Sequence, residues 1–125
     1  MTPFAIAGLQ MPVSALQENV TAMGQRLDLL MARYPWVQMV VFSELAAFGP
    51  LPQHAQPLPG PAEASFQAMA ARHGIWLLPG SLFEKKEGRI FNTAPVIDPR
   101  GQVIARYRKM FPFRPYEATT TPGSE

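Results

Sequence analysis

A short run of mainly apolar residues, Val37 to Phe42, is followed at once by a single carboxylate, Glu44. A strand formed by this run has apolar side chains on both faces, which is typical of a strand covered above and below in an α/β sheet. In such sheets the carboxyl ends of the strands open onto the ligand crevice, so Glu44 is a candidate for acting on a substrate. The alternative is a solvated carboxylate that only caps a loop.

Similar runs flank this one, separated by helical patterns. Phe4 to Leu9 predicts a first buried strand and Ile75 to Pro79 a third strand. Between them, apolar residues recur at helical spacing from a capping box at Ser14 to Tyr34, and again from Pro61 to Gly74. The resulting β-α-β-α-β order predicts parallel pairing of the three strands and an α/β fold.

The rest of the chain predicts strands only. A polar turn at residues 85–88 joins two arms of a hairpin, and Asp98 to Gly101 has the composition of a type I turn before a returning strand, Gln102 to Arg108. The small polar residues Asn92, Thr93 and Ala94 interrupt the second arm and are a candidate for a bulge, although nothing in the sequence decides it.

The segment from Phe48 to Pro61 is rich in proline and predicts an ordered loop or lid beside Glu44, with a simple spacer as the alternative. It contains His54. His73 is interpreted as a residue at a helix C-terminus. With no other ligand types near these two histidines, the sequence predicts neither a metal site nor a cofactor.

Composition narrows the classes of function. The 125 residues, 47% hydrophobic, suit one globular domain, taken as residues 1–125. The 11 basic and 9 acidic residues are scattered, so nucleic acid is not an expected partner. The absence of a basic leader and of an apolar run of about 20 residues predicts a soluble, cytoplasmic protein without a membrane segment. The absence of cysteine excludes disulfides, thiolate zinc sites and a cysteine nucleophile from this chain.

Lys109 follows the last predicted strand. Alternation places it on the more apolar strand face, with Val103, Ala105 and Tyr107. Burying an ammonium there costs free energy unless carboxylates pair with it. A desolvated lysine with acid partners is a frequent functional arrangement. The alternative is a lysine that extends past the strand end into water.

Four motifs together resemble the amino-terminal half of a nitrilase-superfamily carbon-nitrogen hydrolase. They are FSEL after an apolar strand, the proline-rich loop, IFNTAPVIDPRG and RYRKMFPFRPYE. The resemblance covers nearly all 125 residues and implies about half of an α-β-β-α sandwich. It also implies Glu44 as general base, Lys109 as oxyanion-stabilising lysine, Glu117 as second acid and Phe113 as substrate contact. The spacing from Lys109 to Glu117 is most similar to the aliphatic amidase branch.

The resemblance implies hydrolysis of an amide, a nitrile or an N-carbamoyl amine through a cysteine-linked acyl-enzyme, without a cofactor, in a homo-oligomer. Because this chain has no cysteine, we expect the isolated chain to be inactive and the nucleophile to lie beyond it. Two alternatives remain open. One is a non-catalytic binding or scaffold domain of the same fold, and the other is a hydrolase that uses the carboxylates of Glu44 and Glu117 without a cysteine.

Overall fold

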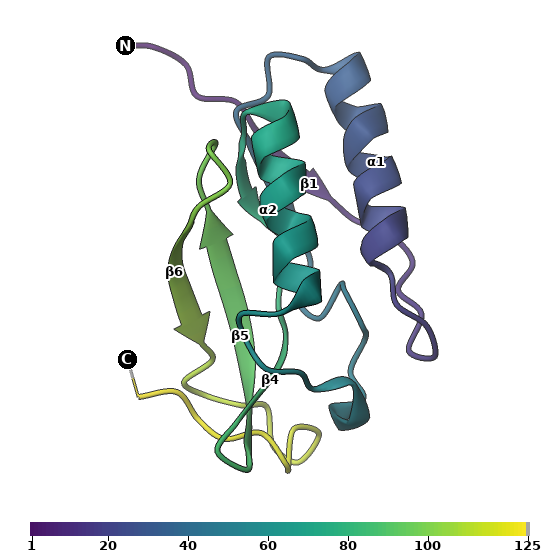
Figure 1. The fold of residues 1–125 in the computed structure, drawn as a ribbon, viewed down its shortest axis with the longest axis vertical. Helices are drawn as coiled ribbons and strands as arrows, with labels where there is room; N and C mark the ends of the chain where they lie inside the picture. Colours follow the sequence, from purple (N-terminus) through teal and green to yellow (C-terminus); the bar gives the residue numbers. More distant parts are fainter. Residues whose placement is uncertain (125) are drawn as a thin grey trace.

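The apolar runs form one mixed sheet of six strands within residues 1–124, the part of the chain that this computed structural model describes (Figure 1). The sheet order is β1-β2-β3-β5-β4, and β6 pairs with the other edge of β5. The strands are β1 (Ile6–Leu9), β2 (Met39–Phe42), β3 (Trp76–Leu78), β4 (Leu82–Lys86), β5 (Arg89–Ile97) and β6 (Val103–Arg108).

The sequence prediction of the pairing is confirmed. β1, β2 and β3 are parallel neighbours, with Ile6 opposite Met39 and Met39 opposite Trp76. β5 is antiparallel to β3, β4 and β6, so the second part of the chain adds hairpins to a parallel start. The fold is therefore of the predicted α/β class.

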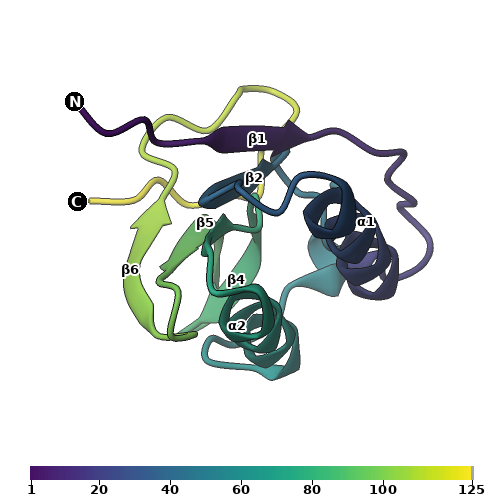
Figure 2. The same ribbon diagram turned by 90° about the horizontal axis from the view of Figure 1, so that it is seen from above.

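Two helices, α1 (Val20–Arg33) and α2 (Pro61–His73), cover the same side of the sheet (Figure 2). Their apolar residues and those of β2 and β3 form one buried cluster, which includes Met23, Leu27, Phe66, Val40 and Leu77. Burying this stripe is what stabilises the helices, because helices of 13 and 14 residues are marginal in water by themselves. No helix among residues 1–124 has the length and apolarity needed to span a bilayer.

The predicted start of the first helix is wrong: the residue that precedes the helix is Asn19, five positions after Ser14. Ser14 Oγ accepts the backbone N–H groups of Leu16 and Gln17, but these bonds close a local turn, and Leu16 is exposed. Asn19 is the residue before α1, and its buried amide donates to Ser14 O and to Ala47 O. A serine with a partner three residues on is equally suited to a turn and to a cap, so the signal was ambiguous.

The second helix has the predicted ends. Pro61 is its first residue, Gly74 adopts the left-handed conformation beyond its last turn, and His73 lies in that last turn. The proline-rich segment before it is ordered as expected, with a 3-10 turn, η1 (Pro52–His54), and a bridge from Gln56 to Glu84 of β4.

Two expectations about the strands need correction. The sequence predicts a buried β1, yet Ile6 is 61% exposed, because its side chain lies on the sheet face opposite the helices, in register with Met39 of β2. Residues 92–94 pair in regular register, and the irregularity of β5 lies instead between Val96 and Ile97.

The sheet face opposite the helices has no covering layer within the described residues. The side chains on it are apolar and half-buried or exposed, and they come from neighbouring strands: Met39, Val41, Trp76, Leu78, Ala94, Val96 and Tyr107. We call this surface the open sheet face. A monomer rarely leaves a contiguous apolar surface of this kind in water.

Candidate active site

Glu44 lies in the loop that leaves the carboxyl end of β2, and the residues that follow β3 hold this loop. The backbone N–H of Leu45 donates to Ser81 Oγ at 3.0 Å, and Leu45 has a positive φ of 56°. Gly80 approaches so closely that a Cβ there would stand 1.8 Å from the carbonyl oxygen of Ser43. The backbone is therefore fixed on both sides of Glu44, although the Glu44 side chain itself is 55% exposed.

Lys109 extends the pairing of β6 with β5 by one residue. Its backbone N–H donates to the carbonyl oxygen of Asn92 at 2.8 Å, so the end of the strand aims the side chain. The side chain leaves the sheet on the open face beside Tyr107, and 28% of it is exposed. Val103, which alternation placed on the same face, packs against the core instead, because the pairing of β5 shifts its register between Val96 and Ile97.

Glu117 belongs to the loop that follows Lys109, and this loop is closed by its own hydrogen bonds. The backbone N–H of Glu117 donates to Phe113 O at 2.9 Å, and the backbone N–H of Phe113 donates to the Glu117 carboxylate. The guanidinium of Arg114 donates to the carbonyl oxygens of Glu117 and Thr120. The loop thereby turns the Glu117 carboxylate back toward the end of β6.

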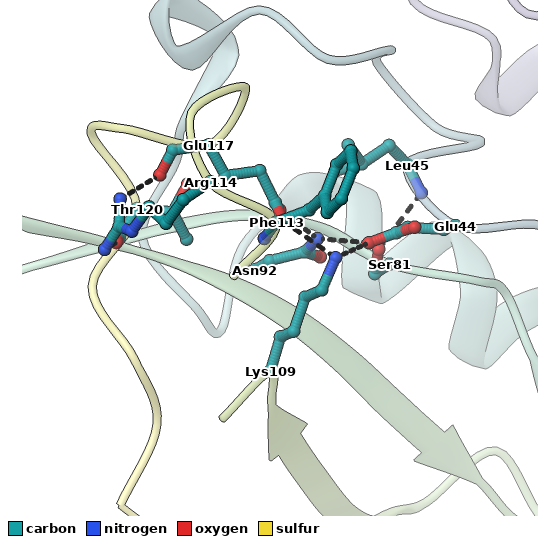
Figure 3. A network of polar contacts seen from close by, with 9 residues as sticks. All are labelled: Glu44, Leu45, Ser81, Asn92, Lys109, Phe113, Arg114, Glu117 and Thr120. Atoms are coloured by element: carbon teal, nitrogen blue, oxygen red, sulfur yellow. Dashed lines mark hydrogen bonds and ion pairs between the residues drawn. The ribbon is translucent and has the colours of Figure 1, made fainter. Parts of the chain in front are cut away.

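The ammonium of Lys109 lies between the two carboxylates (Figure 3). Nζ is 2.8 Å from Oε1 of Glu44 and 2.8 Å from Oε2 of Glu117. The structure thus brings together three residues that the sequence singled out, and Lys109 has the acid partners that its position requires.

These contacts shift two pKa values. The hydrogen bond to Glu117, followed by the one to Glu44, raises the pKa of Lys109 above its usual value. Burial raises the pKa of Glu117, but hydrogen bonds from Lys109, from the backbone of Phe113 and from Asn92 outweigh burial, so its pKa lies below the usual value. Lys109 is therefore a cation and Glu117 an anion at neutral pH.

Two cavities meet at this cluster. One, of about 380 Å³, opens on the open sheet face, and Val41, Leu78 and Tyr107 line it together with Glu44 and Lys109. The other, of about 240 Å³, lies under the loop of residues 113–120. Phe113 and Tyr116, whose rings stack at 5.3 Å, line this second cavity beside Glu44, Lys109 and Glu117. The fourth predicted site residue, Phe113, thus lies beside the other three.

Sequence reasoning missed three residues that shape the site. Asn92 donates to both carboxylates, Ser81 holds the loop of Glu44, and Arg114 closes the loop of Glu117. Asn92 was noticed only as a candidate for a bulge. The available signal was that Asn92 is a polar residue in a mainly apolar strand, because a buried polar side chain needs a hydrogen-bond partner.

The two histidines lie elsewhere. His54 Nε2 is 2.9 Å from Ala15 O, and His73 Nε2 is 2.7 Å from Asp28 Oδ1. Among residues 1–124, no three histidine, aspartate or glutamate side chains gather in a way that would hold a metal ion.

The fold is shared with solved structures of amidases and of nitrilase-superfamily proteins. An amidase from Nesterenkonia sp. AN1 superposes with a TM-score of 0.82 at 26% identity, over 98% of this chain and 51% of that one. A carbon-nitrogen hydrolase from Helicobacter pylori G27 superposes with a TM-score of 0.81 at 24% identity, over 97% of this chain and 45% of that one.

The chain belongs to the carbon-nitrogen hydrolase family, whose sequence model matches residues 5–124. It is 27% identical to omega-amidase NIT2 of Homo sapiens over 116 residues, which are 90% of this chain and 42% of that protein. It is 28% identical to a formamidase of Helicobacter acinonychis over 128 residues, with 91% of this chain and 38% of that protein covered. The chain thus spans less than half the length of these two curated relatives. Membership in the nitrilase superfamily, predicted from the motifs, is confirmed.

Proposed function

We propose that this chain supplies the base and the oxyanion-binding half of an active site that hydrolyses a non-peptide carbon-nitrogen bond. One observation carries the proposal: the ammonium of Lys109 stands 2.8 Å from each of two carboxylates, at the place where two cavities meet. In this reading Glu44 is the general base, Lys109 binds the oxyanion, Glu117 holds Lys109, and Phe113 contacts the substrate.

The first step is the attack of a cysteine thiol, supplied from outside these 125 residues, on the carbonyl carbon of an amide. Glu44 takes the thiol proton as the carbon–sulfur bond forms. Its Oε1 accepts hydrogen bonds from Lys109 and Asn92, whereas its Oε2 accepts none from the other residues that the structure describes. A lone pair on Oε2 is thus available for the proton.

As the tetrahedral intermediate forms, negative charge gathers on the former carbonyl oxygen. The ammonium of Lys109 has one hydrogen left after its two contacts with carboxylates, and that hydrogen is placed to donate to the oxyanion. A fixed donor of this kind contributes about 3 to 4 kcal/mol to the transition state of acyl transfer.

Collapse of this intermediate breaks the carbon–nitrogen bond. Glu44 returns its proton to the nitrogen, ammonia or an amine leaves, and a thioester remains. In the second half of the reaction Glu44 takes a proton from water as the water oxygen attacks the thioester. The carbon–sulfur bond then breaks, Glu44 returns the proton to the sulfur, and the carboxylic acid leaves. The same carboxylate therefore acts in both halves.

The names of relatives favour an amide as the substrate over a nitrile or an N-carbamoyl amine. The relatives described above are an omega-amidase, a formamidase and an amidase. A variant of the Nesterenkonia amidase, 25% identical, carries acrylamide added to its active-site cysteine. These relatives support a small amide and a cysteine nucleophile for this chain as well. The spacing of Lys109, Phe113 and Glu117 favours the aliphatic amidase branch.

The open sheet face supports the proposal that this chain is half of a sandwich. Completing the sandwich across this face would cover its apolar side chains and bring further residues to the cavity beside Glu44 and Lys109. Alone, the chain has a base and an oxyanion donor but no nucleophile, and we expect it to be inactive.

The alternative without a cysteine, in which the two carboxylates act directly, is disfavoured because both are bonded to the same ammonium. The binding or scaffold alternative predicts ligand binding without turnover.

The test is an assay of the full-length gene product with small amides, nitriles and N-carbamoyl amines, following ammonia release with and without hydroxylamine. The proposal predicts ammonia from at least one amide, and a hydroxamate when hydroxylamine intercepts the acyl-enzyme. Turnover without hydroxamate would contradict the acyl-enzyme, and tight binding without turnover would support the scaffold alternative.

A further inference from the structure

Asn92 is a buried residue inside the sheet, next to the proposed active site. It lies in β5, with β4 on one side, where it is opposite Phe83, and with the extension of β6 on the other. Its backbone carbonyl accepts the N–H of Lys109, and only 3% of the residue is exposed. The two carboxylates of the cluster, by contrast, belong to loops.

The side-chain amide of Asn92 donates to both of these loop carboxylates. Nδ2 is 2.8 Å from Oε1 of Glu44 and 3.2 Å from Oε1 of Glu117. Ionised carboxylates only accept hydrogen bonds, so the NH₂ end of the amide must face them, with one hydrogen for each. Asn92 and Lys109 therefore bridge the same two acids from different strands.

The charges of the two carboxylates and the one ammonium favour the hydrogen bonds that Asn92 donates. Glu44, Glu117 and Lys109 together carry two negative charges and one positive charge, so the carboxylates are not neutralised by the lysine alone. Two carboxylates that share a site repel each other and favour protonation. The two N–H dipoles of Asn92 reduce this repulsion without adding an ion, and so leave the ammonium free to meet an oxyanion.

We propose that Asn92 is a positioning residue of the reaction, which holds the carboxylates of Glu44 and Glu117 at fixed places on either side of the Lys109 ammonium by donating one hydrogen bond to each. This inference rests on the proposed function for its catalytic meaning, but the electrostatic part of it holds whether or not the protein turns over an amide. Its role differs from that of a space-filling core residue, because it acts through donated hydrogen bonds.

The direct test is a carboxyl ¹³C NMR titration of the full-length gene product and its Asn92→Leu variant. Leucine matches asparagine in shape and donates nothing. Losing a hydrogen bond to an ionised group corresponds to roughly one pH unit, so the titration midpoint of Glu117 should rise by about that amount. An unchanged midpoint would overturn the proposal, and the result does not depend on any catalysis.

Steady-state kinetics of the same variant are the second test. In the amidase assay, Asn92→Leu should lower kcat about tenfold or more while KM changes less, because the donors act on the acids and not on the substrate. The matched control is Gln67→Met, which removes a side-chain amide that donates to Gly101 O at 2.7 Å, far from the site. The control should keep both kcat and the midpoint of Glu117.

A third measurement needs no variant, in case Asn92→Leu does not fold. In the wild-type protein the two side-chain amide protons of Asn92 should give separate, slowly exchanging signals whose positions follow the titration of Glu117. Amide signals that stay constant through that titration would overturn the proposal. If amide turnover is absent but these NMR results hold, the proposed function fails and the bridging role stands.

Discussion

The ammonium nitrogen of Lys109 and Oε1 of Glu44 lie 2.8 Å apart, although 65 positions separate these residues in the chain. The contact exists because β2 and β6 have their carboxyl ends at the same end of one sheet. Glu44, two residues beyond β2, thus meets Lys109, whose backbone continues the pairing of β6 with β5. The contact therefore depends on the correct pairing of the strands between these two residues and forms only in the folded chain.

Replacing Lys109 separates the proposed mechanism from its carboxylate-only alternative. Lys109→Met should lower kcat/KM for an amide by roughly 10²-fold to 10³-fold, because the oxyanion loses its donor. The alternative predicts little change. The control is Lys85→Met, which removes an exposed lysine of β4. Ammonia release measures both variants.

Glu44→Gln tests the general base. The amide keeps the shape of the side chain but accepts no proton, so we expect a loss of roughly 10²-fold or more in kcat. Because the Glu44 side chain is mostly in solvent, the melting temperature should change little. Glu87→Gln, in the exposed turn between β4 and β5, should leave both quantities unchanged. Near-wild-type activity of Glu44→Gln would remove Glu44 from the mechanism.

Gly80→Ala tests whether the close approach to Ser43 fixes the loop of Glu44. Both Gly80 and Gly88 have positive φ, so alanine at either position costs about 1 to 2 kcal/mol of stability. Only at Gly80 would the new Cβ meet a backbone oxygen, at 1.8 Å, whereas nothing lies within 4 Å of one at Gly88. Gly80→Ala should therefore be the less stable variant in urea unfolding and should also lose activity. Equal losses of unfolding free energy in Gly80→Ala and Gly88→Ala would contradict the close approach of Gly80 to the carbonyl oxygen of Ser43.

Acid should destabilise the fold through Glu84, which is buried and receives two hydrogen bonds from Arg108. The hydrogen bond from Arg108 lowers the pKa of Glu84, against the effect of burial. The unfolded chain thus takes up the proton first, so this stabilisation is complete above the unfolded-state pKa and is lost as the pH falls through the folded-state pKa.

Glu84→Gln measures this contribution. The variant should lose about 2 to 3 kcal/mol of unfolding free energy at pH 7, the low end for a buried pair since Arg108 is partly in solvent. Its stability should then fall less steeply than that of the wild type between pH 7 and pH 3. Parallel pH curves for the two proteins would contradict the assignment.

The 125-residue chain by itself should not remain monomeric. Its open sheet face exposes apolar side chains from neighbouring strands, and water favours covering them. Size-exclusion chromatography with light scattering should show dimers or larger species. A monodisperse monomer would argue that the open sheet face is stable in water and that no second layer is required.

Much of the fold followed from the sequence because its signals were local. Apolar runs, turn residues and the proline and glycine at the ends of α2 each act within a few positions, and together they predicted the strands, the second helix and the parallel pairing at the start of the chain. The prediction of where α1 starts failed because a serine such as Ser14 can close a turn as well as cap a helix. The prediction that Ile6 is buried failed because hydropathy does not show that one face of the sheet has no covering layer in the described residues.

The site was only partly predictable for a related reason. Phe113 and Glu117 came from resemblance to a family alone, whereas the residue pattern gave independent reasons for Glu44, at the carboxyl end of a strand, and for Lys109, by strand alternation. Asn92 and Ser81 act through contacts with residues 48 and 36 positions away, and no local pattern marks such contacts. The chemistry of a polar residue in an apolar strand shows that it needs a partner, but not which one.

Glu44 and Lys109 lie at the border of the open sheet face. The base and the amine stand on the rim of the surface that a second layer would cover, so the seam between the halves would run through the reaction centre. In the chain alone, solvent reaches both groups: 55% of the Glu44 side chain and 28% of the Lys109 side chain are exposed.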